Sequence, residues 1–119
     1  MIVPCPSSPN CVSTEAQDKT HAVEPFLVLA SRDDLWAQVR EILLSLPRTS
    51  LAEENPNYLH AECRSAKLGF IDDLELQLRS EQGKVVVRSA ARSGYYDFGV
   101  NRRRVEQLRQ LLQVRGLIR

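Results

Sequence analysis

Three consecutive arginines lie where a helix should begin. Residues 94–104 read GYYDFGVNRRR, and an apolar helical pattern follows in VEQLRQLL. The first turn of a helix has free backbone N–H groups and the positive end of the helix dipole, so it favours anions and disfavours cations. Arg102, Arg103 and Arg104 therefore require an acidic neighbour or a bound anion. Arginine suits either one, because its guanidinium binds carboxylates and phosphates with two parallel hydrogen bonds.

Helical spacing separates the three arginines from one another. At about 100° per residue, the apolar stripe that begins at Val105 points in the same direction as Asn101, one turn earlier. Arg104 and Arg102 flank this stripe on opposite sides. We therefore expect Arg104 to point toward a sheet and Arg103 to point into solvent.

One source of negative charge is internal. Asp97 lies in the preceding loop, and Asp72 and Asp73 lie on a predicted strand where Asp72 shares the apolar face. A carboxylate at the edge of a core needs a partner, because burying it unpaired is costly. Arg88 and Arg92 share a face of the next strand, and a hairpin would bring them beside the two aspartates. Which aspartate they meet depends on the register, which the sequence leaves open.

The other source is an external anion, and both sources can coexist. A phosphate, a carboxylate or a lipid headgroup could be held by Arg88, Arg92 and Arg104 together with the helix N-terminus. Aspartates beside these arginines would then orient guanidinium groups that also contact the ligand. The sequence thus predicts a noncatalytic binding or accessory module for a small anionic ligand or for an acidic group of a protein or lipid.

The alternative function is a hydrolase that uses Asp72 or Asp73 as its general base in an arginine-lined pocket. Neighbouring arginines lower the pKa of a carboxylate, whereas a general base needs a raised one, so we rank this second. Nucleic-acid binding ranks last, because the net charge is +1 and the basic segment has a single aromatic pair, Tyr95 and Tyr96. The oligomeric state stays open.

Three cysteines allow one disulfide and no zinc site. Cys5 and Cys11 flank the turn-forming stretch PSSPN, a spacing that permits a small disulfide in an oxidising compartment. Tetrahedral zinc needs three or four ligands, and no nearby Cys or His supplies them. Cys63 lies in a strand pattern and is expected to be a small buried hydrophobic residue. We expect neither a metal nor a cofactor.

The elements that position these residues follow from hydrophobic periodicity. Residues 1–24 are rich in Pro, Ser and Thr without a period, and are expected to wrap over the domain as an irregular segment outside its sheet. A short apolar run at residues 25–30 predicts a strand. Apolar residues at helical spacing follow this run. They predict a helix that has Ser31 as its N-cap and ends at Pro47.

In the second half of the chain, apolar and polar residues alternate with the period of two that is typical of strands. Alternating patterns run through Leu59–Cys63 and through residues 70–79, and a turn with Gly83 leads into a return strand at residues 84–93. The last helix is expected to start at Asn101 as its N-cap and to stop at Gly116. This order predicts a single α+β domain over residues 25–119. It would have one antiparallel sheet of four to five strands and two helices on one face.

Three segments carry a family resemblance: CPSSPNCVS, GFIDDLELQL and VVVRSAARSGYYDFGVNRRRVEQL. They are similar to the bacterial and plastid family called domain of unknown function 1499, whose motifs occur here in the family's order along nearly the whole chain. The matching positions are Cys5, Pro6, Ser8, Pro9, Asn10, Cys11, Val12, Ser13, Gly69, Phe70, Asp72, Asp73, Arg88, Ser89, Arg92, Gly94, Asp97, Gly99, Asn101 and Arg104. Ala91 stands where the family pattern has Ser, so a hydroxyl at this position cannot be essential to this protein.

The resemblance implies no established activity, cofactor or partner. It adds Ser89 to the candidate ligand-binding residues, beside the arginines and Asn101. From the chain as written, without a signal-peptide pattern or an apolar stretch of about 20 residues, we expect a cytoplasmic protein. The resemblance also implies relatives with a membrane or export segment, which makes a periplasmic or membrane-associated protein the alternative if a leader was removed.

Overall fold

The structure is a computed structural model that describes residues 2–29 and 33–119. Its elements in chain order are β1 (Cys11–Ser13), β2 (Phe26–Leu27), α1 (Leu35–Leu44), β3 (Thr49–Asn55), β4 (Tyr58–Arg64), β5 (Ile71–Arg79), the 3-10 helix η1 (Ser80–Gln82), β6 (Lys84–Ala91) and α2 (Val100–Val114). This is the α+β class that the periodicity predicted.

The six strands of the described residues form one antiparallel sheet. The strand order is β1-β6-β5-β4-β3, and β2 pairs with β6 beyond the end of β1. The prediction of four to five strands was too low, because β6 is long enough to pair with two short segments in succession on its outer edge. One of them, β1, belongs to residues 1–24, so the expectation that this segment stays outside the sheet was wrong.

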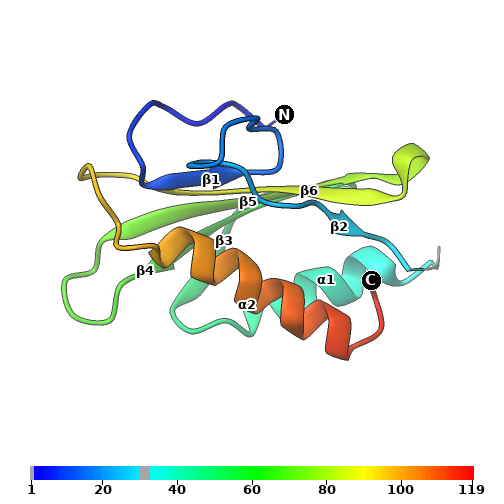
Figure 1. The fold of residues 1–119 in the computed structure, drawn as a ribbon. Coiled ribbons are helices and arrows are strands. Elements are labelled where there is room, and N and C mark those ends of the chain that lie inside the picture. Colours follow the sequence, from blue (N-terminus) through cyan, green and yellow to red (C-terminus); the bar gives the residue numbers. More distant parts are fainter. Residues whose placement is uncertain (1, 30–32) are drawn as a thin grey trace.

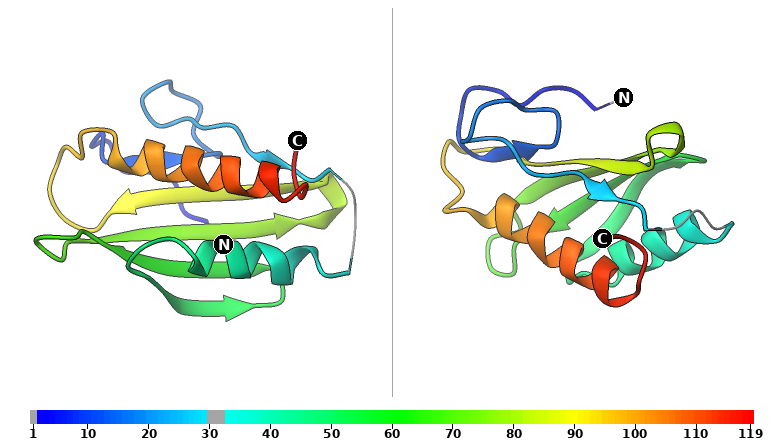
Figure 2. Two further views of the ribbon diagram at one scale, coloured as in Figure 1. Left: turned by 90° about the horizontal axis from the view of Figure 1, so that it is seen from below. Right: turned by 45° about the vertical axis from the view of Figure 1, so that its right-hand side comes forward.

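The sheet separates two layers of different character. Figure 1 and both views of Figure 2 show α1 and α2 side by side on one face of the sheet, with residues 2–10 crossing the opposite face. The helix face holds the main core, because alternate residues of the strands project there and meet the apolar stripes of the helices. Its fully buried large side chains include Phe26, Leu43, Leu59, Leu74, Leu76, Val85, Val87, Leu108 and Leu112.

The opposite face is covered by a smaller apolar contact. Ile2 packs there against Tyr58 of β4 and Val86 of β6. The N-terminal segment therefore does wrap over the domain, although three of its residues also extend the sheet as β1.

The helix ends differ in detail from the predicted ones. α1 begins at Leu35 with Asp34 as its N-cap, while Ser31, the predicted N-cap, lies outside the described residues. α2 begins at Val100 with Gly99 as its N-cap, so Asn101 is a residue of the helix itself. Gly116 follows the end of α2 with φ +75°, in the left-handed region that stops a helix, as predicted.

Candidate functional site

The start of α2 is capped from outside the helix by Asp97. One carboxylate oxygen accepts a hydrogen bond from the Gly99 N–H at 2.9 Å, and the other accepts one from the Asn101 N–H at 3.0 Å. Burial opposes ionisation of Asp97, but these hydrogen bonds and a third from the Asn101 side chain hold its pKa below its usual value. Asp97 therefore supplies the negative charge that the helix N-terminus requires.

Asn101 is fully buried and connects three elements. Its side-chain oxygen accepts hydrogen bonds from the Ser89 hydroxyl of β6 at 2.6 Å and from Arg104 at 2.8 Å. Its side-chain N–H₂ donates to Asp97 at 2.9 Å and to the Asn10 backbone carbonyl at 3.3 Å. An amide is the side chain that donates and accepts at once, which explains an asparagine at this point in the core.

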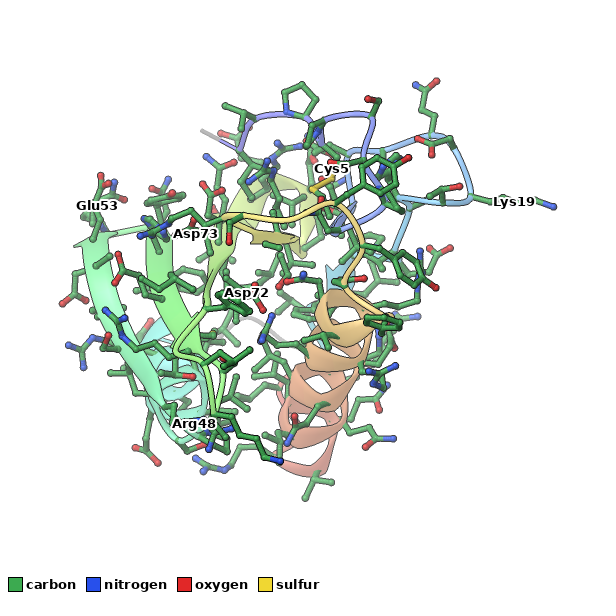
Figure 3. The ribbon with its side chains drawn as sticks, turned by 90° about the vertical axis from the view of Figure 1, so that its left-hand side faces the viewer. Cys5, Lys19, Arg48, Glu53, Asp72 and Asp73 are labelled. Atoms are coloured by element: carbon green, nitrogen blue, oxygen red, sulfur yellow. A yellow bond between two sulfur atoms is a disulfide. The ribbon has the colours of Figure 1, made fainter. Side chains whose placement is uncertain are left out.

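Arg104 meets Asp72 on the helix face of the sheet. The Nη2 atom of Arg104 lies 2.8 Å from the Oδ2 atom of Asp72, and both side chains are about 15% exposed (16% and 15%). Figure 3 shows Asp72 in the space between the sheet and α2. Burial raises the pKa of the Asp72 carboxyl, and the neighbouring guanidinium opposes this rise. This ion pair confirms two expectations, that Arg104 points to the sheet and that Asp72 pairs with an arginine.

Asp73 points to the opposite face, as alternation along a strand requires. It accepts hydrogen bonds from Arg92 at 2.6 Å and faces the Nε2 atom of His60 at 2.7 Å, and Arg92 also reaches Glu62 at 3.0 Å. Although burial works against ionisation, the hydrogen bonds from Arg92 and His60 hold the pKa of Asp73 below its usual value. This network lies at the surface, where Arg92 is half-exposed.

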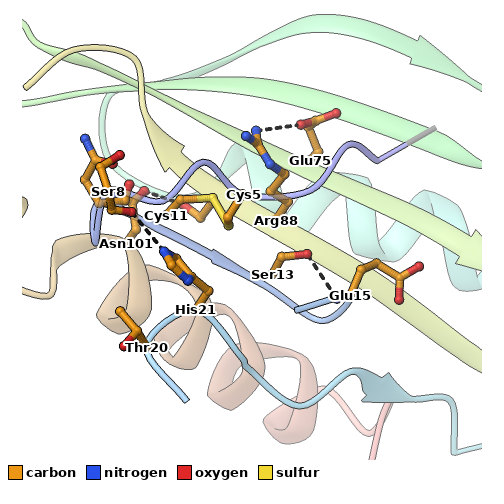
Figure 4. The surroundings of a disulfide bond; sticks show 12 residues. Cys5, Ser8, Cys11, Ser13, Glu15, Thr20, His21, Glu75, Arg88 and Asn101 are labelled. Carbon is orange, nitrogen blue, oxygen red and sulfur yellow. Dashed lines mark hydrogen bonds and ion pairs between the residues drawn. A yellow bond between two sulfur atoms is a disulfide. The ribbon is translucent and has the colours of Figure 1, made fainter. Parts of the chain in front are cut away.

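Arg88 lies on the same face as Asp73 but makes a separate contact. Its Nη1 atom is 3.3 Å from Oε1 of Glu75, whose other oxygen accepts a hydrogen bond from the Tyr58 hydroxyl at 2.5 Å. Figure 4 shows the Arg88–Glu75 pair beneath the N-terminal segment and close to the Cys5–Cys11 bond. Within the described part of the chain, the Nε atom of Arg88 is buried without a hydrogen-bond partner.

The predicted candidate residues therefore divide between two faces of the sheet. Asp72, Ser89, Asp97, Asn101 and Arg104 form one connected network at the start of α2. Asp73, Arg88 and Arg92 lie on the opposite face, so the expectation that all the arginines converge beside the last helix was wrong. The register decides this, because Asp72 pairs with Ala91 and Asp73 with Ala90, which places Arg88 opposite Glu75.

The N-terminal segment is fixed to both layers. Cys5 and Cys11 form a disulfide with their Cα atoms 5.8 Å apart, the pairing that the sequence permitted. Between them, the Asn10 side chain donates to the Gly94 carbonyl at 2.7 Å, and the Asn10 carbonyl accepts from Asn101. Cys63 is buried and unpaired, as expected.

A pocket of about 190 Å³ opens between the start of α2 and the ends of α1, β3 and β4, and we call it the arginine pocket. Arg48, Arg64, Arg103 and Arg104 line it, and its lining includes no carboxylate. The complete lining is Leu46, Pro47, Arg48, Thr49, Cys63, Arg64, Val100, Arg103, Arg104 and Gln107. Sequence reasoning missed Arg48 and Arg64, because nothing in their local pattern indicates which helix they approach.

A second pocket of about 380 Å³ lies on the other side of the Asp72–Arg104 pair, and we call it the aromatic pocket. Its aromatic residues are Phe70, Tyr96 and Phe98, and all three are more than half exposed. The complete lining is Ser65, Phe70, Ile71, Asp72, Ala91, Ser93, Gly94, Tyr96, Asp97, Phe98 and Val100. Val100 belongs to both pockets, so the two are adjacent.

Sequence reasoning also missed the polar partners on the outer face. Tyr58 and His60 alternate along β4, and Glu75 follows two residues after Asp73 on β5. The sequence shows the alternation that places these side chains on the polar side of two strands. It does not show that they pair with Asp73 and Arg88, because those contacts depend on the register of three strands.

Fold and site together define a small α+β domain in which a disulfide-closed N-terminal segment covers one face of the sheet and two helices cover the other. The model of the family described as "Protein of unknown function (DUF1499)" matches residues 1–112. The chain belongs to this family, as its motifs indicated. Comparisons with curated proteins and with solved structures gave no match.

Two features are absent from residues 2–29 and 33–119. In these ranges, no helix is both long enough and apolar enough to cross a membrane. In the same ranges, no three His, Cys, Asp or Glu side chains gather as a group that could hold a metal ion.

Proposed function

We propose that this protein is a noncatalytic binding module that holds a small anion, a phosphate or a carboxylate, in the arginine pocket. The observation that carries the proposal is the lining of that pocket, which includes four arginines from three parts of the chain and no carboxylate. Like charges brought together in this way repel one another, and a bound anion relieves the repulsion.

The contacts of the individual arginines support this proposal. Arg48 donates a hydrogen bond to the Arg64 carbonyl, and within residues 2–29 and 33–119 no carboxylate forms an ion pair with it. Arg64 is 3.6 Å from Glu62, a loose pair in which the Arg64 side chain is half-exposed. Among the described residues, Arg103 has no hydrogen bond or ion pair through its side chain. These three side chains can turn toward a ligand without breaking a buried contact.

The proposal differs from the sequence-based one in where the anion lies. The helix N-terminus is already occupied by the Asp97 carboxylate, and Arg88 and Arg92 are paired with Glu75 and Asp73. Arg104 is shared between Asp72 and the arginine pocket. Of the predicted ligand-binding residues, it is therefore the one that we assign to the anion site.

Strain in the backbone at the pocket is a further argument for a function. Arg48 adopts φ +51°, in the left-handed region that a non-glycine residue enters at a cost of about 1 kcal/mol or more. Such conformations concentrate at ligand-binding sites, where the position of a side chain outweighs local stability. Here the conformation places Arg48 at the pocket between α1 and β3.

Thermal denaturation in phosphate, sulfate and acetate, with sodium chloride at matched ionic strength as reference, tests the anion site. We expect phosphate to raise the melting temperature above the chloride reference, because a ligand that binds only the folded state stabilises it. Arg103→Gln and Arg48→Gln should each weaken phosphate binding about tenfold or more, the effect of losing one charge-assisted hydrogen bond.

The matched control is Arg115→Gln, which removes the same charge from the far end of α2, outside the pocket. It should leave phosphate binding unchanged. Equal melting temperatures in phosphate and chloride, or an equal loss of binding in Arg115→Gln, would contradict the proposal.

A hydrolase remains the second candidate because of one observation at Asp72. Burial raises the pKa of this carboxyl, and the residue lines the aromatic pocket, as a general base would. Its ion pair with Arg104 acts against that role, and we rank it second for this reason. Turnover of a phosphate or carboxylate ester that is abolished in Asp72→Asn would reverse the ranking.

A further inference from the structure

The arginine pocket and the aromatic pocket are adjacent. Val100 lines both, and the Asp72–Arg104 ion pair joins a residue of the aromatic pocket, Asp72, to a residue of the arginine pocket, Arg104. A ligand that is bound in one pocket is therefore next to the other.

The two pockets differ in chemistry. The arginine pocket presents positive charge, whereas the aromatic pocket presents the exposed rings of Phe70, Tyr96 and Phe98 beside Ile71 and Val100. These three rings are exposed by 58%, 61% and 76%, and Tyr96 and Phe98 pack edge to face at 4.9 Å. Exposed apolar clusters of this kind mark binding sites, because leaving them in water is unfavourable.

The two acids in the aromatic pocket do not make it an anionic site. Both carboxylate oxygens of Asp97 accept hydrogen bonds from the start of α2, and Asp72 is paired with Arg104. Their negative charges are therefore already stabilised by hydrogen bonds and an ion pair within the protein. What remains for a ligand in this pocket is mainly apolar contact.

From this adjacency we propose that the ligand is an amphiphile, a single molecule with an anionic head group and an alkyl or acyl chain. The head group binds in the arginine pocket, and the chain lies across Val100 into the aromatic pocket. This inference rests on the proposed anion site and adds the chemical class of the ligand. A pocket of about 380 Å³ has room for several methylene groups of such a chain.

Calorimetric titration with inorganic phosphate, hexyl phosphate and octyl phosphate, each below its micelle-forming concentration, tests the proposal. Each methylene that becomes fully buried should strengthen binding about fourfold. We expect octyl phosphate to bind about 100-fold more tightly than inorganic phosphate, the gain from about three to four fully buried methylenes, with hexyl phosphate between them. Octyl glucoside, which has the same chain and a neutral head group, should bind far more weakly than octyl phosphate.

Two variants assign the two parts of the ligand to the two pockets. Phe98→Asn removes an exposed ring, and asparagine tolerates the φ of +55° at this position. It should weaken octyl phosphate about tenfold and leave inorganic phosphate unchanged. Arg103→Gln should weaken both ligands. Val114→Asn, at an exposed apolar position near the end of α2, is the matched control and should change neither.

The outcomes separate this inference from the proposed function. If inorganic phosphate binds and octyl phosphate binds no more tightly, the amphiphile is ruled out and the anion site stands. Equal binding of octyl phosphate and octyl glucoside overturns the amphiphile, because the head group is then not recognised. An unchanged octyl phosphate affinity in Phe98→Asn overturns the assignment of the chain to the aromatic pocket. If neither phosphate binds, both proposals fail.

Discussion

At the scale of single residues, Asn101 decides how the start of α2 is built. It sits in the first turn of the helix, fully buried, and uses its amide to join β6, the Asp97 loop and the N-terminal segment. The Asp97 carboxylate and the Ser89 hydroxyl approach it from opposite sides, one as an acceptor and the other as a donor. A side chain that only accepts hydrogen bonds cannot satisfy this site.

Asn101→Asp tests this role with hardly any change of shape. The new carboxylate would place an acceptor where Asn101 now donates, 2.9 Å from an oxygen of Asp97. We expect the free energy of unfolding to fall by about 2–4 kcal/mol, because a buried charge faces a second one and two hydrogen bonds are lost. Urea denaturation at neutral pH measures the change.

The matched control for this variant is Gln110→Glu, the same amide-to-acid change at an exposed position on α2. It should alter the free energy of unfolding by only a few tenths of a kcal/mol, since about ±0.5 kcal/mol is usual for surface changes. An Asn101→Asp protein as stable as its control would mean that the amide donors of Asn101 contribute nothing.

At the scale of elements, β6 is the strand on which the domain is assembled. It pairs with β5 along its whole length on one edge and with β1 and β2 on the other. Through β1 it holds the N-terminal segment, which the disulfide closes into a short loop over the outer face. That segment covers Tyr58 and Val86 with Ile2 and brings Asn10 to the start of α2.

Opening the disulfide should therefore loosen an element that supports the site. Cys5→Ser removes a cross-link between residues six positions apart, for which restriction of the unfolded chain predicts about 2 kcal/mol of stabilisation. We expect the free energy of unfolding to fall by this amount, and wild-type protein with a reducing agent to match the variant. Urea denaturation of the three samples provides the comparison.

Hydrogen exchange at the start of α2 extends this prediction. Because Asn10 contacts both Gly94 and Asn101, amide protection at Gly99–Asn101 should fall when the disulfide is reduced. Unchanged stability and protection after reduction would show that Ile2 and the Asn10 hydrogen bonds hold the segment without the cross-link.

At the scale of the whole molecule, the sheet separates the acids whose titration governs stability. Asp73 on the outer face and Asp97 at the start of α2 both have pKa values below the ordinary one in the folded protein, whereas burial raises the pKa of Asp72 between them. The first two groups release their protons more readily in the folded state. Asp72 holds its proton more strongly there.

These directions fix the sign of the dependence of stability on pH. The stability that Asp73 and Asp97 contribute is fully present above their unfolded pKa of about 4 and is lost as the pH falls through their folded pKa. Asp72 acts in the opposite direction, because its raised pKa lowers stability as the pH rises from about 4 through its folded value. The pKa values of Asp18 and Glu54 are also lowered in the folded protein, by hydrogen bonds from His21 and Arg40. Four carboxyls against one therefore predict a net loss of stability in acid.

Urea denaturation between about pH 7 and about pH 2 measures this loss, and Asp97→Asn isolates one contribution to it. We expect the variant to be less stable than wild type at neutral pH and to lose less stability on acidification, since the titrating cap is gone. Parallel stability curves for the two proteins would show that Asp97 does not titrate differently in the folded and unfolded states.

Much of the fold was predictable from local patterns. Alternation from Phe70 to Arg79 and the turn at Gly83 indicated the β5–β6 hairpin, and the stripe from Val105 to Leu112 indicated α2 and its stop. The pairing of β1 and β2 with β6 was not predictable, because strands of three and two residues have too short a pattern to be distinguished from a loop. The capping of α2 was likewise assigned to the wrong residue, since Asp97 and Asn101 are both good caps.

The sequence by itself determined the α+β class, the family, the need of Asp72 at the edge of the core for an arginine partner, and the cysteine spacing that allows a disulfide. These follow from periodicity, from motif order and from the cost of burying an unpaired charge. Only the tertiary structure decided that Arg88 and Arg92 lie across the sheet from Arg104, and that Arg48 and Arg64 join Arg103 instead. The physical reason is the register of the strands, because a shift of one residue moves a side chain to the other face of the sheet. The local sequence does not specify which strand lies opposite.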